Sequence, residues 1–327
     1  MMIKINNVFI ADEIEQECVD TLLQNGIRVT VRTNESKEQL LKIVPLYDAV
    51  IVRSATKMTK ELIEAGAQGH LKVIGRAGTG VDNIDIPSAT ENGIIVMNTP
   101  AGNSQSAAEL TCSLILALAR NVCQADASMK AGKWARKNYM GEEVGGKTLA
   151  IIGLGRIGQM VCTRMQAFGM NIIGYDPCLT KEAAKAKGIE LLSLEEIYPK
   201  ADYISVHVPL IKETENLLNK VTLAKCKKGV KIINVARGGI VNEEDLVAAI
   251  QSNHVGGAAF DVYVEEPPKY RDLIENNKVI TTPHLGASTK EAQNRVAIEI
   301  AENLIALNEN KGIFGAINAK DVFSRMN

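Results

Sequence analysis

Aromatic residues and charge of one sign are both scarce in this sequence. Only 4% of its 327 residues are Phe, Trp or Tyr, and the formal net charge is −1. A protein that binds nucleic acid needs a basic surface to neutralise phosphates, and a single-strand binder also needs aromatic rings on which bases stack. Nucleic acid is therefore not predicted as a partner. We expect any anionic ligand to be small and held by a few placed arginines.

Long apolar runs and cysteine or histidine motifs are missing as well. No uncharged apolar stretch reaches the roughly 20 residues that a membrane-spanning helix needs, and the start MMIKINNVFIADE lacks the apolar core of a signal peptide. The six cysteines form no C-x-x-C pair, and the four histidines lie far apart without an H-E-x-x-H pattern. The sequence therefore predicts a cytoplasmic protein with reduced thiols, no membrane partner and no metal site.

What the sequence does contain is a regular alternation of short apolar runs and helix-like stretches. Predicted strands cover 8–11, 28–31, 49–52, 72–75 and 94–97, and then 148–152, 171–175, 203–206, 231–234, 257–260 and 279–281. Such alternation indicates parallel sheets with crossover helices. The predicted fold class is α/β with two doubly wound parallel-sheet domains, and the six strands of the second series match a nucleotide-binding domain.

Helix signals agree with this organisation. Asp12 is expected to cap the first helix and Gly26 to end it, while Ser36 and Gln39 have the spacing of a capping box. The stretch 103–120 is apolar around much of its circumference, which predicts a helix buried on several sides, either in the core or in a subunit contact. A final amphipathic helix is expected over 290–307.

A glycine-rich turn is the clearest local signal. Gly153, Gly155 and Gly158 form G-x-G-x-x-G directly after an apolar strand and at the head of a helix, where the backbone can approach a pyrophosphate. The next strand ends at Asp176, and a carboxylate there binds a ribose 2′-hydroxyl and repels the 2′-phosphate of NADP. The residues that follow, including Cys178, supply no arginine for such a phosphate. NAD is therefore the predicted cofactor.

Hydride transfer from an alcohol also needs a base for the hydroxyl proton and a cation for a carboxylate. Among the histidines, His207 and His284 follow predicted strands of the nucleotide domain, and His284 follows the last one, at the edge where doubly wound sheets bind ligands. Glu266 is its predicted carboxylate partner, with Glu265 as the alternative. Arg237, between a strand and two glycines, suits a bidentate grip on a carboxylate. The predicted catalytic residues are thus Arg237, Glu266 and His284.

The ordered motifs GLGRIG, NVARGGIV, DVYVEEPP and TPHLGAST resemble the signatures of the D-2-hydroxyacid dehydrogenase family. VRSATK (52–57), GRAGTGVDNID (75–85), MNTPAGNSQSAAEL (97–110) and ASMKAGKWARK (127–137) are similar to the branch of that family that acts on a phosphorylated substrate. The resemblance implies a discontinuous, flavodoxin-like substrate-binding domain, residues 1–98 and 289–327. A Rossmann NAD-binding domain, residues 99–288, would be inserted into it.

The resemblance also implies a set of site residues. Expected around the cofactor are Thr79, Arg156, Ile157, His207, Val208, Val235, Ala236, Arg237, Asp261, His284, Gly286 and Ala287, in addition to the three glycines and Asp176. Expected around the substrate are Arg53, Arg76, Asn103, Arg136, Arg237 and His284. Arg136 would reach in from a partner subunit, because the 99–140 region resembles the family's dimerisation arm, so a homodimer or homotetramer is predicted.

The implied reaction is the oxidation of 3-phospho-D-glycerate to 3-phosphooxypyruvate with NAD+, the first step of serine biosynthesis from that compound. A glyoxylate or hydroxypyruvate reductase of the same family is the alternative, and an NAD-sensing corepressor-type module is a third reading from another class. Many members continue into C-terminal regulatory domains, whereas this sequence stops soon after GAINAKDVFSRMN. Regulation through such a domain is accordingly not expected.

Overall fold

The computed structural model describes residues 3–326, and the chain divides into two compact units. The first unit comprises Met1–Asn103 and Thr289–Asn327, and the second comprises Ser104–Ser288. The first unit is thus built from two separate stretches of sequence. Each unit has its own parallel sheet, which confirms the predicted fold class.

The first unit holds five strands. Its elements in chain order are β1 (Asn7–Ile10), α1 (Gln16–Gln24), β2 (Arg28–Val31), α2 (Lys37–Ile43), the 3-10 helix η1 (Val44–Leu46), β3 (Ala49–Val52), α3 (Lys60–Ala67), β4 (Val73–Arg76), α4 (Ile86–Glu91), β5 (Ile95–Asn98), α13 (Lys290–Asn308) and α14 (Ala319–Met326). The strand order is β2-β1-β3-β4-β5, which is the flavodoxin-like order.

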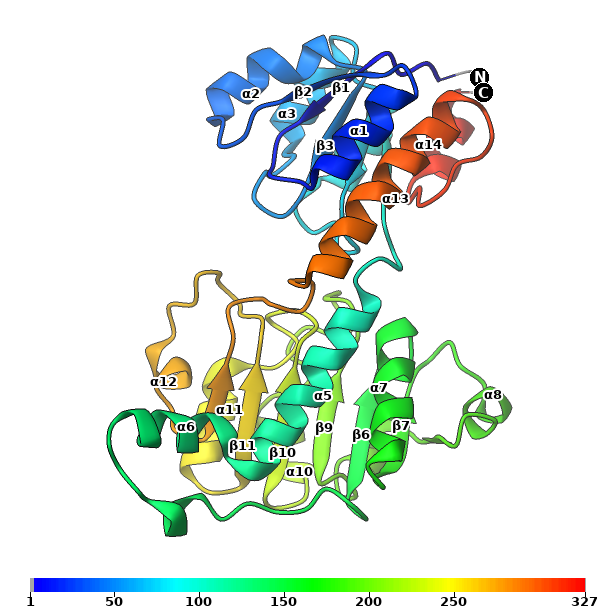
Figure 1. The fold of residues 1–327 in the computed structure, drawn as a ribbon. Coiled ribbons are helices and arrows are strands. Elements are labelled where there is room, and N and C mark those ends of the chain that lie inside the picture. The colour runs from blue at the N-terminus through cyan, green and yellow to red at the C-terminus, as the bar shows by residue number, and fades with distance from the viewer. Residues whose placement is uncertain (1–2, 327) are drawn as a thin grey trace. The chain divides into compact units, whose positions relative to one another are not determined.

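Helices cover both faces of this sheet (Figure 1). Buried residues of α1, α13 and α14 pack on one face, and those of α2, α3 and α4 pack on the other. With both faces covered, the central strand β3 is apolar along its whole length and its AVIV run is fully buried, whereas the edge strand β2 (RVTV) keeps exposed positions. The residues beyond 288 therefore complete the core of the first unit, since α13 buries Val296, Ile300 and Leu304 in it.

The second unit holds seven strands. Its elements are α5 (Ser104–Arg120), α6 (Val122–Lys130), the 3-10 helix η2 (Arg136–Tyr139), β6 (Thr148–Ile152), α7 (Arg156–Ala167), β7 (Asn171–Tyr175), α8 (Lys181–Lys185), β8 (Glu190–Leu191), α9 (Leu194–Ile197), β9 (Tyr203–Val206), α10 (Lys220–Lys225), β10 (Val230–Asn234), α11 (Glu243–Gln251), β11 (Val255–Phe260), α12 (Arg271–Ile274) and β12 (Val279–Thr281).

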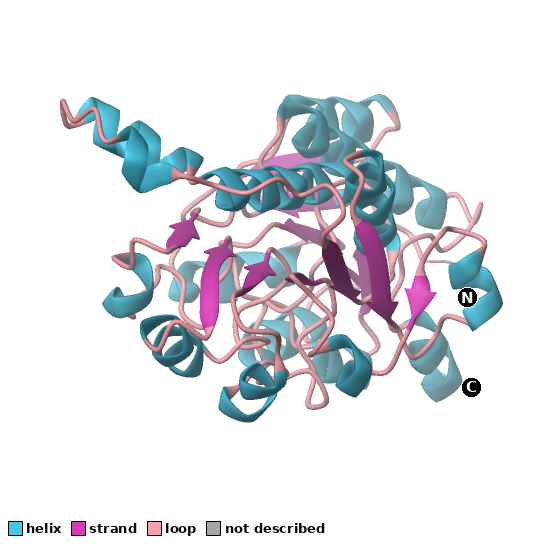
Figure 2. Cartoon of the chain, turned by 90° about the horizontal axis from the view of Figure 1, so that it is seen from below, coloured by secondary structure: helices cyan, strands magenta, loops and turns pink. Residues whose placement is uncertain are grey.

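The order β12-β11-β10-β9-β6-β7-β8 makes this a doubly wound parallel sheet: from β6 the chain adds β7 and β8 on one side, and then β9 to β12 on the other, so the strand order reverses between β6 and β9. Side chains of β6 alternate between the two faces: Ala150 and Ile152 join the core under α10 and α11, whereas Leu149 and Ile151 join the core under α5 and α7. Figure 2 shows the strands between layers of helices. The point of reversal is where such sheets bind ligands, just beyond the carboxyl ends of the strands.

The predicted helix caps can be compared with the observed ones. The Ser36–Gln39 capping box is present at the start of α2. Asp12 does not cap the first helix: α1 begins at Gln16 with Glu15 at its N-cap, and the buried Asp12 carboxylate instead binds the loop after β3. Strand β8 was not predicted because two residues leave too short a pattern, and helix α14, which follows the expected last helix, was not predicted either.

Helix α5 is the long helix expected over 103–120, and it is buried in the core of the second unit against α7. Within residues 3–326 no single helix has the length and apolar composition to cross a membrane, although α5 and α6, which are bent by 67° relative to each other, satisfy both criteria as a pair.

Candidate active site

The glycine turn after β6 is shaped by two close backbone approaches. Gly153 has φ +97°, and a Cβ atom there would lie 2.7 Å from the backbone carbonyl of His207. A Cβ on Gly158 would lie 2.1 Å from the carbonyl oxygen of Gly153. Gly155 differs, since a Cβ there would meet no atom within 4 Å. Gly153 and Gly158 thus let the backbone of the turn pack closely against neighbouring backbone, whereas Gly155 leaves open space at the N-terminus of α7.

That space suits a dinucleotide pyrophosphate. Helix α7 begins at Arg156, and Gly155 at its N-cap carries no capping side chain. The unsatisfied N–H groups and the positive end of the helix dipole favour a phosphate there. The predicted residues Arg156 and Ile157 are the first two of the helix.

Asp176 follows β7 and is tied to this turn. Its Oδ2 accepts a hydrogen bond from the backbone N–H of Leu154 at 2.8 Å, and its Oδ1 accepts one from Cys178 at 2.8 Å. The carboxylate is therefore held beside the glycine turn, as binding of an adenosine ribose requires. The residues present fit NAD at this edge of the sheet.

His207 follows β9, the strand next to β6 at the point of reversal. Its backbone N–H donates to Ile152 at 2.7 Å, and its Nε2 lies 2.8 Å from Oγ of the buried Ser205. Burial lowers the pKa of His207 to about 4, so the ring is neutral at neutral pH. A neutral ring in this position is suited to packing and hydrogen bonding with a cofactor rather than to proton transfer. Val208 follows directly.

The loop after β10 carries Arg237 and is braced by Asn234, a residue that the sequence did not single out. Asn234 is fully buried; its Oδ1 accepts from Ala236 N at 3.0 Å and its Nδ2 donates to Arg237 O at 2.8 Å. Arg237 Nη1 donates to Ala236 O at 2.6 Å. The NVARGG motif could have predicted this role of Asn234, because an Asn that ends a strand just before a polar loop can form hydrogen bonds with the backbone of that loop. Val235 and Ala236 lie between the two.

His284 and Glu266 are brought together by two different loops. Nδ1 of His284 lies 2.7 Å from Oε2 of Glu266, and the two side chains are 48% and 38% exposed. Glu265 instead pairs with Lys269 at 2.5 Å. Of the two adjacent carboxylates, the structure therefore places Glu266 next to the histidine, where it can orient the ring and leave Nε2 for a substrate.

The loop that carries His284 is held in an uncommon conformation by Asp261. His284 has φ +55°, which is rare for a non-glycine residue. The carboxylate of Asp261 is fully buried and accepts hydrogen bonds from Thr282 Oγ1 at 2.6 Å, Leu285 N at 2.7 Å and Gly286 N at 2.8 Å. The three donors flank His284, so Asp261 fixes the loop that presents the imidazole. Ala287 follows Gly286.

Two arginines of the first unit stand at or just beyond the carboxyl ends of strands. Arg53 comes directly after β3, and Arg76 is the last residue of β4, where its Nη1 donates to Ala77 O at 3.0 Å. Thr79 Oγ1 donates to Asn103 Oδ1 at 2.6 Å, which ties the RAGTG loop (76–80) to the end of this stretch. The residues predicted for the first unit thus lie at one edge of its sheet or just beyond.

Arg136 lies away from the other predicted residues of the second unit. It is exposed in η2 and lines a hollow with Arg120, Tyr139 and Glu142. Glu142 accepts hydrogen bonds from Tyr203 and Lys231, which stand near the starts of β9 and β10. Since His284 and Arg237 follow strand ends, Arg136 of the same chain lies at the opposite edge of the sheet.

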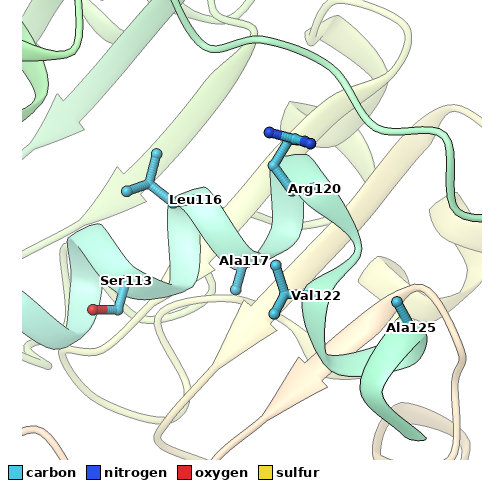
Figure 3. A pocket seen from close by; sticks show the side chains of 6 residues that line it. All are labelled: Ser113, Leu116, Ala117, Arg120, Val122 and Ala125. Atoms are coloured by element: carbon cyan, nitrogen blue, oxygen red, sulfur yellow. The ribbon is translucent and has the colours of Figure 1, made fainter. Parts of the chain in front are cut away.

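A second hollow lies on helices α5 and α6 (Figure 3). It is lined by Ser113, Leu116, Ala117, Arg120, Val122 and Ala125. Ser113 and Arg120 are the polar side chains of this lining, and the rest of it is apolar. In the described part of the chain no group of three or more His, Cys, Asp or Glu residues could hold a metal ion.

Similarity to known proteins agrees with this geometry. Residues 112–286 match the family described as D-isomer specific 2-hydroxyacid dehydrogenase, NAD binding domain. A D-3-phosphoglycerate dehydrogenase of Homo sapiens is 52% identical over 320 residues, which is 98% of this chain and 60% of that protein. One of Bacillus subtilis is 45% identical over 325 residues, 98% of this chain and 61% of that protein. The chain thus spans about 60% of the length of these relatives.

A solved structure shares the whole fold. D-lactate dehydrogenase from Aquifex aeolicus, complexed with NAD and lactic acid, matches with a TM-score of 0.82 and 27% identity over 93% of this chain and 96% of that one. The glycine turn, Asp176 and the pair of His284 and Glu266 lie within the part of this chain that the family match covers. The chain belongs to the D-isomer specific 2-hydroxyacid dehydrogenase family, and residues 112–286 carry its NAD-binding domain.

Proposed function

We propose that this chain oxidises 3-phospho-D-glycerate at C2 to 3-phosphooxypyruvate with NAD+, as the first step of serine biosynthesis from that compound. The observation that carries the proposal is the 2.7 Å contact between His284 and Glu266, on the same edge of the sheet as the glycine turn and Asp176. The relatives named D-3-phosphoglycerate dehydrogenase support the choice of substrate.

Three side chains have roles in this proposal. His284 takes the proton of the C2 hydroxyl at Nε2, while Glu266 holds Nδ1 and stabilises the imidazolium that forms. Arg237 binds the substrate carboxylate and polarises the C2 oxygen. NAD+, when bound, supplies the acceptor for the hydride that leaves C2. We assign the remaining cofactor residues predicted from the sequence to the adenosine and nicotinamide ends of NAD.

The phosphate of the substrate needs cations besides Arg237. We assign it to Arg53 and Arg76 of the first unit, which we propose as the substrate-binding domain (residues 1–98 and 289–327). The NAD-binding domain is then 99–288. Asn103 and Thr79, which are hydrogen-bonded to each other, are assigned to the substrate and nicotinamide respectively.

Arg136 enters the proposal through a partner subunit. We propose a homodimer or homotetramer formed through the 99–140 region. No residue of α6 is buried, and Val122, Met129, Trp134 and Met140 are 53%, 54%, 81% and 85% exposed. Apolar exposure on this scale favours a contact with another protein surface. A second copy would bring its own Arg136 with it. We also propose a cytoplasmic location, which the six free thiols support.

The test is NADH production from 3-phosphoglycerate with a coupling system that removes the product, with D-glycerate and D-lactate as controls. The expected result is turnover of the phosphorylated acid far above that of the two unphosphorylated acids. Arg53→Ala should reduce kcat/KM for 3-phosphoglycerate by roughly 10–100-fold and leave hydroxypyruvate reduction within a few-fold. Arg28→Ala, which removes an exposed arginine of β2, is the matched control.

Turnover of hydroxypyruvate or glyoxylate without 3-phosphoglycerate would replace the substrate and keep the family. Comparable losses on both substrates in Arg53→Ala would remove Arg53 from the phosphate site. Binding of NADH without turnover of any 2-hydroxy acid would favour the NAD-sensing module instead. The oligomeric state is measured by sedimentation, where a monomer would contradict the subunit contact.

A further inference from the structure

Helix α1 begins without the cap that its position calls for. Its N-cap is Glu15, with φ −62° and ψ 142°, and the side chain makes no capping hydrogen bond. Ser, Thr, Asp and Asn are the residues that stabilise this position, because their short side chains reach the free N–H groups of the first turn. The Glu15 carboxylate instead approaches Arg53, with 3.8 Å between Oε2 and Nη1. The residue at this N-cap thus departs from the usual capping preference, and its side chain contacts Arg53, which is distant in the sequence.

Hydrogen bonds with two side chains fix the backbone of residues 53–56, which carries Arg53. Oδ2 of Asp12 accepts hydrogen bonds from Arg53 N at 2.5 Å and Thr56 N at 3.2 Å, and its Oδ1 accepts one from Thr56 Oγ1 at 2.6 Å. On the other side, Nδ2 of Asn83 donates to the carbonyl oxygens of Arg53 and Thr56 at 2.6 Å each. The loop therefore has little freedom, and the direction of the Arg53 guanidinium depends on what its nitrogens bind.

The contact between Arg53 and Glu15 is loose. A charge-assisted hydrogen bond between such groups measures about 2.7–2.9 Å, whereas this pair is 3.8 Å apart. Oε2 of Glu15 is buried, yet it accepts no hydrogen bond from the described residues. The Nη1 atom of Arg53 also donates to Glu13 O, at 3.4 Å. Both contacts are weak, so a better anion can replace them at small cost.

We propose that Glu15 is an internal competitor for the anion that Arg53 binds, and that it sets the affinity for the phosphate group of the substrate. This inference rests on the proposed function, in which Arg53 receives that phosphate. A phosphate offers the guanidinium two short hydrogen bonds and a double negative charge, so it displaces the loose carboxylate. Glu15 then stays nearby as a like charge and lowers the affinity for every anion at Arg53.

The experiment compares binding by calorimetry in the full chain. Glu15→Gln keeps the size of the side chain and removes its charge, so the dissociation constants of 3-phosphoglycerate and of inorganic sulfate should fall by roughly two- to fivefold. Glu17→Gln is the matched control: it removes the same charge from an exposed site of the same helix and should change neither constant. In an Arg53→Ala background, Glu15→Gln should have no effect, because the competitor then has no guanidinium to occupy.

Three results would overturn the proposal. Weaker anion binding in Glu15→Gln would mean that Glu15 orients Arg53. Equal anion affinities in the wild type and Glu15→Gln would mean that the contact between Glu15 and Arg53 has no effect, and so would a failure of both proteins to bind the anions. A change in anion affinity that persists in the Arg53→Ala background would mean that Glu15 acts only through its general charge. A lack of 3-phosphoglycerate turnover counts against the proposed function alone, because the sulfate comparison still decides the role of Glu15. Thermal melts confirm that each variant is folded.

Discussion

Nδ1 of His284 lies 2.7 Å from Oε2 of Glu266, although 18 residues separate them in the chain. The loop after β11 carries the carboxylate and the loop after β12 carries the imidazole, and these strands are neighbours in the sheet. Asp261, at the end of β11, binds the backbone on both sides of His284. Two buried strands therefore determine the geometry of a pair that is itself half exposed.

His284→Ala should lower turnover by roughly 10²–10⁴-fold, because a positioned general acid or base contributes about that much. The dissociation constant of NADH, measured by fluorescence titration, should change little. Glu266→Gln keeps the size of the side chain and should lower turnover less. Activity within a few-fold of the wild type in His284→Ala would show that another group moves the proton.

Two glycines of the turn should respond differently to substitution by alanine. Gly158→Ala should lower the free energy of unfolding by about 1–3 kcal/mol, because its Cβ would lie 2.1 Å from Gly153 O and the backbone would have to move. Gly155→Ala should keep the stability of the wild type, since a Cβ there meets no atom within 4 Å and φ is −68°.

Gly155→Ala should nevertheless bind NADH more weakly, by roughly tenfold or more, because the methyl group would occupy the space proposed for the pyrophosphate. Urea unfolding and NADH titration of both variants separate the two effects. Unchanged NADH affinity in Gly155→Ala would contradict a pyrophosphate at this helix end.

Asp176→Asn should weaken NADH binding and relax the preference over NADPH, by roughly 10–100-fold in the ratio of dissociation constants. The variant removes the negative charge and keeps an acceptor for Leu154 N or Cys178 N, so the turn should stay folded. Titrations with both cofactors give the ratio. A ratio equal to that of the wild type would refute the ribose role of Asp176.

Glu142 should make stability depend on pH in the acid range. Burial raises the pKa of Glu142, but hydrogen bonds from Lys231 and Tyr203 and the charge of Lys231 outweigh burial and lower it to about 2, from an ordinary value of 4.5. The folded state thus binds fewer protons than the unfolded state. The stability that Glu142 contributes is complete above about pH 4.5 and is lost as the pH falls toward 2.

Glu142→Gln should therefore lower the urea midpoint most at pH 7, with a difference from the wild type that shrinks as the pH falls below 4.5. Glu143→Gln, which removes an exposed charge from the adjacent position, is the control and should show no such trend. A difference that is constant from pH 7 to pH 3 would show that the cluster with Lys231 contributes no proton-linked stability.

Local patterns in the sequence were sufficient for the secondary structure and for the positions of the glycine turn and Asp176. Apolar runs with β-branched residues predicted the strands of both sheets except β8, since a two-residue strand leaves too short a pattern. The glycine turn and Asp176 were predictable because their chemistry depends on spacing along one strand–turn–helix unit. The Ser36–Gln39 box was predictable for the same reason: both of its hydrogen bonds lie within one turn.

Contacts between distant segments were decided only by the tertiary structure. The sequence favoured Glu266 over Glu265 only by analogy, and the packing of the loop after β11 is what places Glu266 beside His284. Asp12 was expected to cap a helix, but a buried carboxylate binds the donors closest to it in space, and these belong to residues 53–56. The physical reason is common to both cases: spacing determines which groups meet within a helix turn or strand, whereas sheet order and burial determine which meet across the fold.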